Sequence, residues 1–200
     1  MRDFESVLAA ARDGDEAAFV ALFRSVQPAL LRYLTTLGGP VAEDAAAETW
    51  VSVVKGLTRF AGDEHGFRAW VFTIGHARLR DAQRTAYRAP VPVDAHTELA
   101  DRPSADDVLE SDGELLTTEA ALRLIARLPR DQAEAVLLRH VAGLDVARVA
   151  EVMGKRPGAV RVATHRGLRR LAALYEHVGP AQPAEGPDAG CNALGTRIDD

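Results

Sequence analysis

Residues 143–170, GLDVARVAEVMGKRPGAVRVATHRGLRR, constrain the fold of this chain more than any other stretch. Asp145 can N-cap a helix over 146–153, because its carboxylate can accept a backbone N–H of the first turn. Gly154 lies at the helix stop, where a left-handed backbone favours glycine. Pro157 lies just inside the start of the next helix, where its missing N–H costs nothing. The stretch therefore predicts a helix-turn-helix.

The second helix of this pair is strongly basic. No acidic residue lies between Val152 and Tyr175, a stretch that holds six cations. A helix-turn-helix with a basic second helix is typical of proteins that bind the major groove of DNA. Small or apolar residues stand where the two helices must touch, and these are Val149, Ala150, Met153, Val160 and Ala163. The cations are Lys155, Arg156, Arg161, Arg166, Arg169 and Arg170.

Charge is unevenly distributed along the 200 residues, whose net charge is −5. Residues 1–85 carry 10 basic and 11 acidic side chains (−1), and residues 86–114 carry 2 and 8 (−6). Residues 115–178 carry 11 and 6 (+5), and residues 179–200 carry 1 and 4 (−3). A basic domain is thus separated from a near-neutral one by an acidic connector. The overall acidity argues against strong binding to DNA by the chain alone, because phosphate contacts dominate affinity.

The composition predicts a cytoplasmic protein that does not enter a membrane. The single cysteine, Cys191, cannot form an internal disulfide, which favours a reducing compartment. The N-terminus has acidic residues and no apolar core of a secretion signal. No apolar run approaches the length of a membrane span.

The first domain is predicted to be helical. Apolar residues recur at steps of three and four after Gly14, and Pro28 is expected to break or kink this run into two helices. A further helix is expected over about 41–58, a loop over 60–66, and another helix over about 67–84. In that last helix an inward stripe of Phe67, Trp70, Val71, Ile74 and Ala77 is expected.

Five residues of the 67–84 helix lie four apart and are expected on its outer side: Arg68, Phe72, His76, Arg80 and Arg84. Cations and rings in such a row suit a nucleic-acid strand, since cations hold phosphates and rings stack on bases. A solvated amphipathic helix whose aromatic residues belong to the core would show the same spacing. Spacing alone leaves both interpretations open.

The remaining segments complete an all-α chain of two small domains. Residues 86–114 have no sustained period and read as a linker, 115–178 as the second domain, and 179–200 as a disordered tail. A helix is expected to end at Arg127 and to bury Leu115, Leu122 and Ile125. Asp131 and Glu134 have capping-box spacing and predict the start of a helix that extends through Val141.

The order of these motifs resembles bacterial sigma factors of the extracytoplasmic-function group. Residues 42–50, AEDAAAETW, resemble that family's acidic helix, and residues 67–75, FRAWVFTIG, resemble the segment that follows it. Leu128-Pro129, residues 135–139 (AVLLR) and Gly143-Leu144 resemble the start of its C-terminal domain. Residues 158–161 with His165 and Arg166 resemble its recognition helix. Together the motifs cover about 15–84 and 115–174.

The resemblance implies an alternative sigma factor that binds core RNA polymerase, directs it to promoters and helps to melt DNA. The implied partners are the β′ clamp helices and β flap of the polymerase, promoter DNA and an anti-sigma factor. Polymerase binding is implied for Glu43, Asp44, Glu48 and Trp50. Contacts with the minus-ten element are implied for Arg59, Arg68, Phe72, His76, Arg80 and Arg84. In the minus-thirty-five element, Arg161, His165 and Arg166 would contact bases, and Lys155, Arg156, Arg169 and Arg170 would contact phosphates.

Two other classes of protein are less consistent with the sequence. A free-standing helix-turn-helix regulator would share residues 143–170 but would not need the first-domain motifs or the acidic linker. An enzyme is not indicated, because the six histidines are scattered and no phosphate-binding glycine loop or activated nucleophile is present. No cofactor and no metal site are expected. The sequence departs from the family pattern at Ala47, Ala77, Arg156, Ala163 and Thr164.

Overall fold

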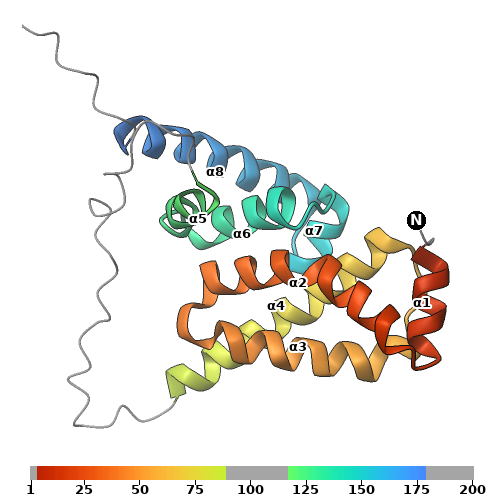
Figure 1. Ribbon diagram of the computed structural model, residues 1–200. Helices are drawn as coiled ribbons and strands as arrows, with labels where there is room; N and C mark the ends of the chain where they lie inside the picture. Colours follow the sequence, from red (N-terminus) through yellow and green to blue (C-terminus); the bar gives the residue numbers. More distant parts are fainter. Residues whose placement is uncertain (1–3, 89–116, 179–200) are drawn as a thin grey trace, which may run out of the picture.

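The computed structural model describes residues 4–88 and 117–178, which form two helical bundles packed against each other (Figure 1). The N-terminal bundle consists of α1 (Phe4–Arg12), α2 (Glu16–Gly38), α3 (Ala42–Gly56) and α4 (Glu64–Arg88), with 3-10 turns at Gly39–Val41 and Leu57–Arg59. The C-terminal bundle consists of α5 (Thr118–Ala126), α6 (Arg130–Val136), a π turn (Leu137–Val141), α7 (Val146–Met153) and α8 (Pro157–Val178). The expected all-α fold is confirmed. The predicted linker beyond residue 88, the tail, Leu115 and Cys191 lie outside the described residues.

Helix α2 runs through Pro28 without a break, so the expected division into two helices is wrong. Pro28 removes one backbone N–H and is itself exposed. The apolar stripe continues on both sides of it, with Val26 and Leu30 at 1% and 0% exposure. Burial of this stripe against α3 and α4 offsets the lost hydrogen bond, which the local propensity of proline could not show.

Packing in the N-terminal bundle brings α4 close to α2. Tyr33, Leu34 and Phe72 are fully buried there, and the rings of Tyr33 and Phe72 meet edge to face with centroids 5.5 Å apart. A Cβ placed on Gly75 would lie 2.8 Å from Leu30 Cδ1. Glycine at this position therefore lets the two helices approach closely.

A loop between α3 and α4 is held against the bundle by aromatic contacts. The ring of Phe60 stacks on Trp70 with centroids 5.0 Å apart, and it meets Phe67 edge to face at 5.6 Å. Asp63 accepts a hydrogen bond of 2.6 Å from the backbone N–H of Gly66 and so satisfies a free donor at the start of α4. This helix begins at Glu64, a few residues before the predicted start.

The expected capping box at Asp131 and Glu134 is wrong. Helix α6 begins at Arg130, after Pro129, and no side chain caps it. Glu134 is buried and contacts α2 and α4 instead of its own helix terminus. The helix then widens into the π turn, in which the Ala142 N–H donates to the Leu137 carbonyl at 2.9 Å.

Shortening a core residue of α2 should destabilise the N-terminal bundle strongly. Leu34 is fully buried, so Leu34→Ala should lower the free energy of unfolding by about 2–5 kcal/mol through lost burial and a residual cavity. The matched change Leu31→Ala, on the same helix at 36% exposure, should cost about 0.5 kcal/mol. Urea unfolding followed by tryptophan fluorescence measures both, since Trp50 and Trp70 lie in this bundle. Equal losses for the two variants would contradict this packing.

Candidate nucleic-acid interface

Helices α7 and α8 form the helix-turn-helix that the sequence predicts. Asp145 N-caps α7, and its carboxylate accepts from the Arg148 backbone N–H at 2.9 Å. Gly154 adopts φ +62° at the end of α7; its N–H donates to the Glu151 carbonyl, and the Lys155 N–H donates to the Ala150 carbonyl at 2.9 Å. This pair of bonds is a Schellman motif, which fixes the angle at which the chain leaves α7.

The basic residues of α8 lie on its solvent side. The helix begins at Pro157 and packs through Val160, which is fully buried against α7 together with Val149. Six of the residues that the sequence assigned to DNA are exposed, and these are Arg156, Arg161, His165, Arg166, Arg169 and Arg170. Lys155 differs, because it is half-buried and forms an ion pair of 2.5 Å with Asp131. Val162, at 49% exposure, adds an apolar side chain to the outer surface of the helix.

Arg166, Arg169 and Arg170 line a groove of about 480 Å³ with Gln132 of α6. None of these three arginines forms an ion pair within the part of the chain that the structure describes. The Oε1 atom of Gln132 is buried without a hydrogen-bond partner among the described residues. Three unneutralised guanidinium groups in one groove are suited to bind phosphates.

On α4, the structure separates the predicted outer residues into exposed and buried ones. Arg80 and Arg84 are exposed, as is Arg59 in the preceding 3-10 turn, and Arg84 forms an ion pair of 2.5 Å with Asp81. Arg68 is half-buried and donates to the Ser25 carbonyl at 2.8 Å.

Two orientations predicted for α4 are wrong. Phe72 was expected on the outer side, yet its side chain is fully buried against Tyr33. Ala77 was expected to face inward and is exposed. Positions four residues apart drift around a helix with 3.6 residues per turn, so part of such a row can face the core while the rest faces solvent.

His76 lies in a polar cluster at the contact between the bundles, together with Tyr33 of the N-terminal bundle and Glu134 of the C-terminal bundle. The Tyr33 hydroxyl donates to Glu134 Oε1 at 2.9 Å and lies 3.1 Å from His76 Nδ1. His76 Nδ1 is in turn 2.6 Å from the same carboxylate oxygen. Burial, followed by the Glu134 charge, raises the pKa of the Tyr33 hydroxyl well above its ordinary value. This hydroxyl therefore stays protonated and acts as a hydrogen-bond donor.

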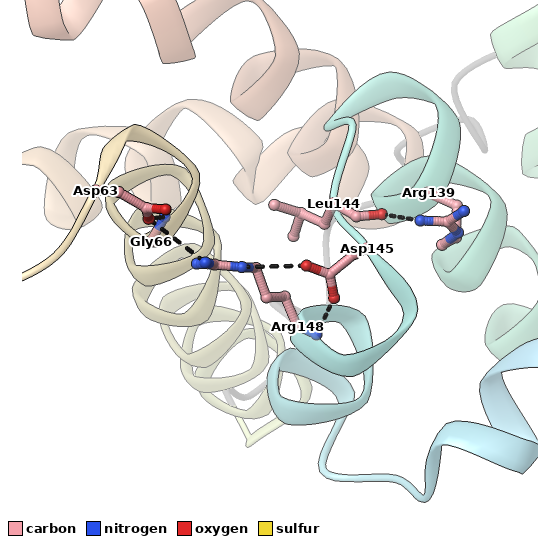
Figure 2. Close-up of polar contacts among 6 residues, drawn as sticks. All are labelled: Asp63, Gly66, Arg139, Leu144, Asp145 and Arg148. Carbon is pink, nitrogen blue, oxygen red and sulfur yellow. Dashed lines mark hydrogen bonds and ion pairs between the residues drawn. The ribbon is translucent and has the colours of Figure 1, made fainter. Parts of the chain in front are cut away.

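A second polar contact joins the bundles at Arg148 of α7 (Figure 2). The guanidinium lies 3.2 Å from Asp145 Oδ2 and 3.4 Å from Asp63 Oδ1, so it bridges the two carboxylates. The backbone N–H of Gly66, and then the Arg148 charge, lower the pKa of Asp63. The backbone N–H of Arg148 lowers the pKa of Asp145 in the same way. The neighbouring Arg139 donates to the Leu144 carbonyl and holds the turn before α7.

Between the bundles lies a basic cleft of about 730 Å³. Arg80, Arg84 and Arg88 of α4 line it from one side, and Arg130 and Lys155 of the C-terminal bundle line it from the other. The cleft thus brings together cations that the sequence placed in different domains.

The acidic residues predicted to bind a protein partner lie on one exposed surface of α3. Glu43, Asp44 and Glu48 are all exposed. Val51 and Val54, at 47% and 55% exposure, extend this surface with apolar side chains that the sequence interpretation missed. Their helical spacing from Asp44 and Glu48 is the signal that could have found them.

Trp50 of α3, also predicted to bind the polymerase, is buried at 8% exposure. Its indole N–H donates to Gln27 Oε1 at 2.6 Å, and its ring packs on Phe19 and Phe23. A buried ring cannot contact a partner directly. Trp50 instead fixes α3 on α2 and so orients the exposed surface.

Within residues 4–88 and 117–178, no group of three acidic, histidine or cysteine side chains is arranged to hold a metal ion. None of the helices in these ranges has the length and apolar content needed to cross a bilayer.

Family models match both bundles: "Sigma-70 region 2" matches residues 22–89, and "Sigma-70, region 4" matches residues 118–171. The ECF RNA polymerase sigma factor ShbA of Streptomyces griseus is 38% identical over 194 residues, which cover 88% of this chain and all of that protein. This chain belongs to the extracytoplasmic-function sigma factors. The sigma factor SigD of Mycobacterium tuberculosis is 32% identical over 179 residues, which cover 84% of this chain and 81% of that protein.

Two solved structures share the fold of this one. CnrH, in complex with the cytosolic domain of CnrY, aligns with a TM-score of 0.57 at 24% identity and covers 86% of this chain and 96% of its own. RpoE of Bartonella quintana, in complex with the anti-sigma factor NepR, aligns at 0.58 with 20% identity and covers 79% and 96%. As an alternative sigma factor, the protein directs RNA polymerase to promoters. The free-standing regulator is not favoured, because region 2 is matched as well as region 4.

Removing the cap of α7 should destabilise the helix-turn-helix. Asp145→Ala should cost about 1 kcal/mol, whereas Asp145→Ser should cost much less because serine also caps helices. Since the pKa of Asp145 is lowered in the folded state, its contribution is present above the ordinary aspartate range and is lost as the pH falls through the folded pKa. Thermal unfolding of the parent and both variants at neutral and acidic pH tests this. A difference between the parent and Asp145→Ala that grows as the pH falls would contradict the capping role.

Proposed function

We propose that this sigma factor binds promoter DNA through two separate basic surfaces and core polymerase through the acidic surface of α3. The proposal rests on the presence, in one chain, of exposed cations on α8 and exposed carboxylates on α3. Run-off transcription from a promoter pool with core enzyme, with and without the protein, tests it. Absence of promoter-specific transcripts, together with tight DNA binding by the chain alone, would exclude it.

Helix α8 is proposed to enter the major groove of the minus-thirty-five element. Arg161, His165 and Arg166 would contact base edges there, and Val162 would contact thymine methyl groups. Arg156, Arg169 and Arg170 would bind phosphates and set the register. Lys155 would join them after release from Asp131.

The minus-ten strand is proposed to follow the exposed side of α4 and the preceding loop. Arg59, Arg80 and Arg84 are exposed and would bind its phosphates, with Arg68 and His76 nearer the bundle. Phe72 would act by packing rather than by stacking on a base, since it is buried. Extruding a base costs a few kcal/mol of stacking, which contacts with the loop at residues 60–63 would offset.

The β′ clamp helices are proposed to bind the α3 surface of Glu43, Asp44, Glu48, Val51 and Val54. Carboxylates around exposed valines combine a charged rim with an apolar centre, the arrangement found in protein interfaces. The buried Trp50 would keep α3 in register on α2.

The remaining assignments follow the same proposal. The proposed domains are 1–85 and 115–178, with a linker over 86–114 and a tail over 179–200. The linker would pass through the polymerase cleft toward the RNA exit path. The C-terminal domain would also contact the β flap. An anti-sigma factor is proposed as a further partner, as NepR is for the related RpoE. The protein would act in the cytoplasm, without a catalytic activity of its own.

Truncating one residue that is proposed to contact bases should weaken initiation at promoters without affecting binding to core polymerase. Arg161→Ala should lower initiation about tenfold at promoters with a strong minus-thirty-five element, because a good base contact is worth about 1–3 kcal/mol. The matched control is Arg127→Ala, an exposed arginine at the end of α5. Transcription and core-binding assays on both variants are the measurement. Loss of core binding in Arg161→Ala would mean that α8 faces the polymerase instead.

Reversing one charge on α3 should weaken the holoenzyme. Glu48→Lys should lower affinity for core polymerase about fivefold to tenfold and make it less sensitive to salt, because an attractive charge becomes repulsive. Glu151→Lys, at an exposed position of α7, makes the same change in net charge and should bind core as the parent does. Fluorescence anisotropy with labelled protein measures the affinities. Similar behaviour of the two variants would remove α3 from the polymerase interface.

A further inference from the structure

Helix α1 (Phe4–Arg12) precedes the residues that the region 2 model matches, and none of the sequence motifs assigned it a role. It packs on α2, and its Leu8 and Ala11 are buried. At its N-terminus the ring of Phe4 lies 5.9 Å from that of Phe67, near the start of α4. The helix therefore lies at the end of the bundle where α3 passes into α4 (Figure 1).

The last residue of α1, Arg12, reaches across to the turn at the end of α3. Its Nε donates to the Leu57 carbonyl at 3.2 Å, and its guanidinium also donates to the Phe60 carbonyl. Carbonyls at the end of a helical segment lack donors within the segment, and a nearby cation also interacts favourably with the helix dipole. Arg12 is half-buried and forms no ion pair with the residues that the structure describes. Its donors thus hold one carbonyl at the first residue of the 3-10 turn and another directly after the turn.

The loop that follows this turn has few contacts of its own. Ala61 and Gly62 are exposed, and neither forms a hydrogen bond with the described residues. A Cβ placed on Gly62 would lie 2.9 Å from Phe60 Cζ, so the backbone passes close to this ring. The loop is fixed at one end by Arg12 and the ring contacts of Phe60, and at the other end by the side chain of Asp63. Removing Arg12 would therefore loosen the first of these two ends.

We infer that Arg12 is a positioning residue for minus-ten recognition, which holds the loop at 60–63 in the conformation that receives an extruded base. The inference rests on the proposed function, since that proposal assigns this loop and Arg59 to the melted strand. A loop that is already ordered loses less conformational entropy when a ligand binds, so it binds more tightly. Bases that stay outside the loop are held only through their phosphates, which do not distinguish one base from another. Loss of the anchor should lower the base preference as well as the affinity.

Holoenzyme binding to a single-stranded minus-ten oligonucleotide tests this role. The strand is taken from a promoter that run-off transcription identifies, and each position is varied to the four bases. The position at which the parent shows its strongest preference reports the extruded base. Arg12→Ala should lower affinity for the preferred base about fivefold to tenfold, and affinity for the other three bases less than about twofold. Arg12→Lys keeps the charge but lacks the planar guanidinium, so its effect should lie between those of the parent and Arg12→Ala.

Two other arginines serve as matched controls. Arg139→Ala also removes a guanidinium that donates to a backbone carbonyl, that of Leu144 in the C-terminal bundle. Arg24→Ala removes an exposed arginine of α2 and makes the same change in net charge. Both should leave the base preference in the minus-ten strand unchanged. A variant that only lowered the amount of folded protein would weaken binding to all four bases alike, so the ratio of affinities separates positioning from stability.

Amide hydrogen exchange in the free protein reports on the loop without DNA. The Phe60 N–H donates to the Gly56 carbonyl at 3.1 Å. In Arg12→Ala its exchange should be about tenfold faster, because the end of the turn has lost hydrogen bonds to a charged donor. Arg139→Ala should leave this exchange rate unchanged.

The two measurements together decide the role of Arg12. An unchanged base preference in Arg12→Ala holoenzyme would overturn the inference, whatever the exchange rate, and would leave the proposed function standing. A reduced preference with unchanged exchange at Phe60 would mean that Arg12 does not act through the loop, which also overturns it. A parent holoenzyme without base preference anywhere in this strand would instead reject the proposed contact between the loop and the minus-ten element.

Discussion

Glu134, a buried carboxylate held by the hydroxyl of Tyr33 and the ring of His76, is the central polar contact between the two halves of this molecule. The buried apolar residues of the two bundles form one continuous cluster, which includes Leu30 and Leu34 of one bundle and Leu137 and Leu138 of the other. Apolar burial therefore holds the halves together. Because a buried carboxylate is costly unless donors satisfy it, Glu134 favours the arrangement in which Tyr33 and His76 face it.

Features fixed by local chemistry could be predicted from the sequence. The helix-turn-helix was predicted in detail because Asp145, Gly154 and Pro157 act on backbone groups within a few residues of themselves. The exposure of Glu43 and Glu48 follows from the same helical spacing that buries Val53. In each of these cases the determining interaction is short in sequence, so the pattern contains it.

Features fixed by distant partners could not be predicted. The capping-box spacing of Glu134 was misleading because its real partners lie 101 and 58 residues away, on α2 and α4. Pro28 did not break α2, since burial of the flanking stripe outweighed one lost hydrogen bond. Phe72 was assigned to the outer side because a row of every fourth residue was treated as one surface. The position of Arg148 between two aspartates has no signature in the sequence at all.

The uneven charge of the chain bears on how it would bind DNA. Phosphate contacts dominate affinity for DNA, and the chain as a whole has a net charge of −5. The C-terminal segment nevertheless has a net charge of +5, from 11 basic and 6 acidic side chains over 115–178. Under the proposed function, polymerase holds this basic surface and that of α4 on the promoter together. Specific initiation would then depend on coupling the two basic surfaces, rather than on the strength of either one.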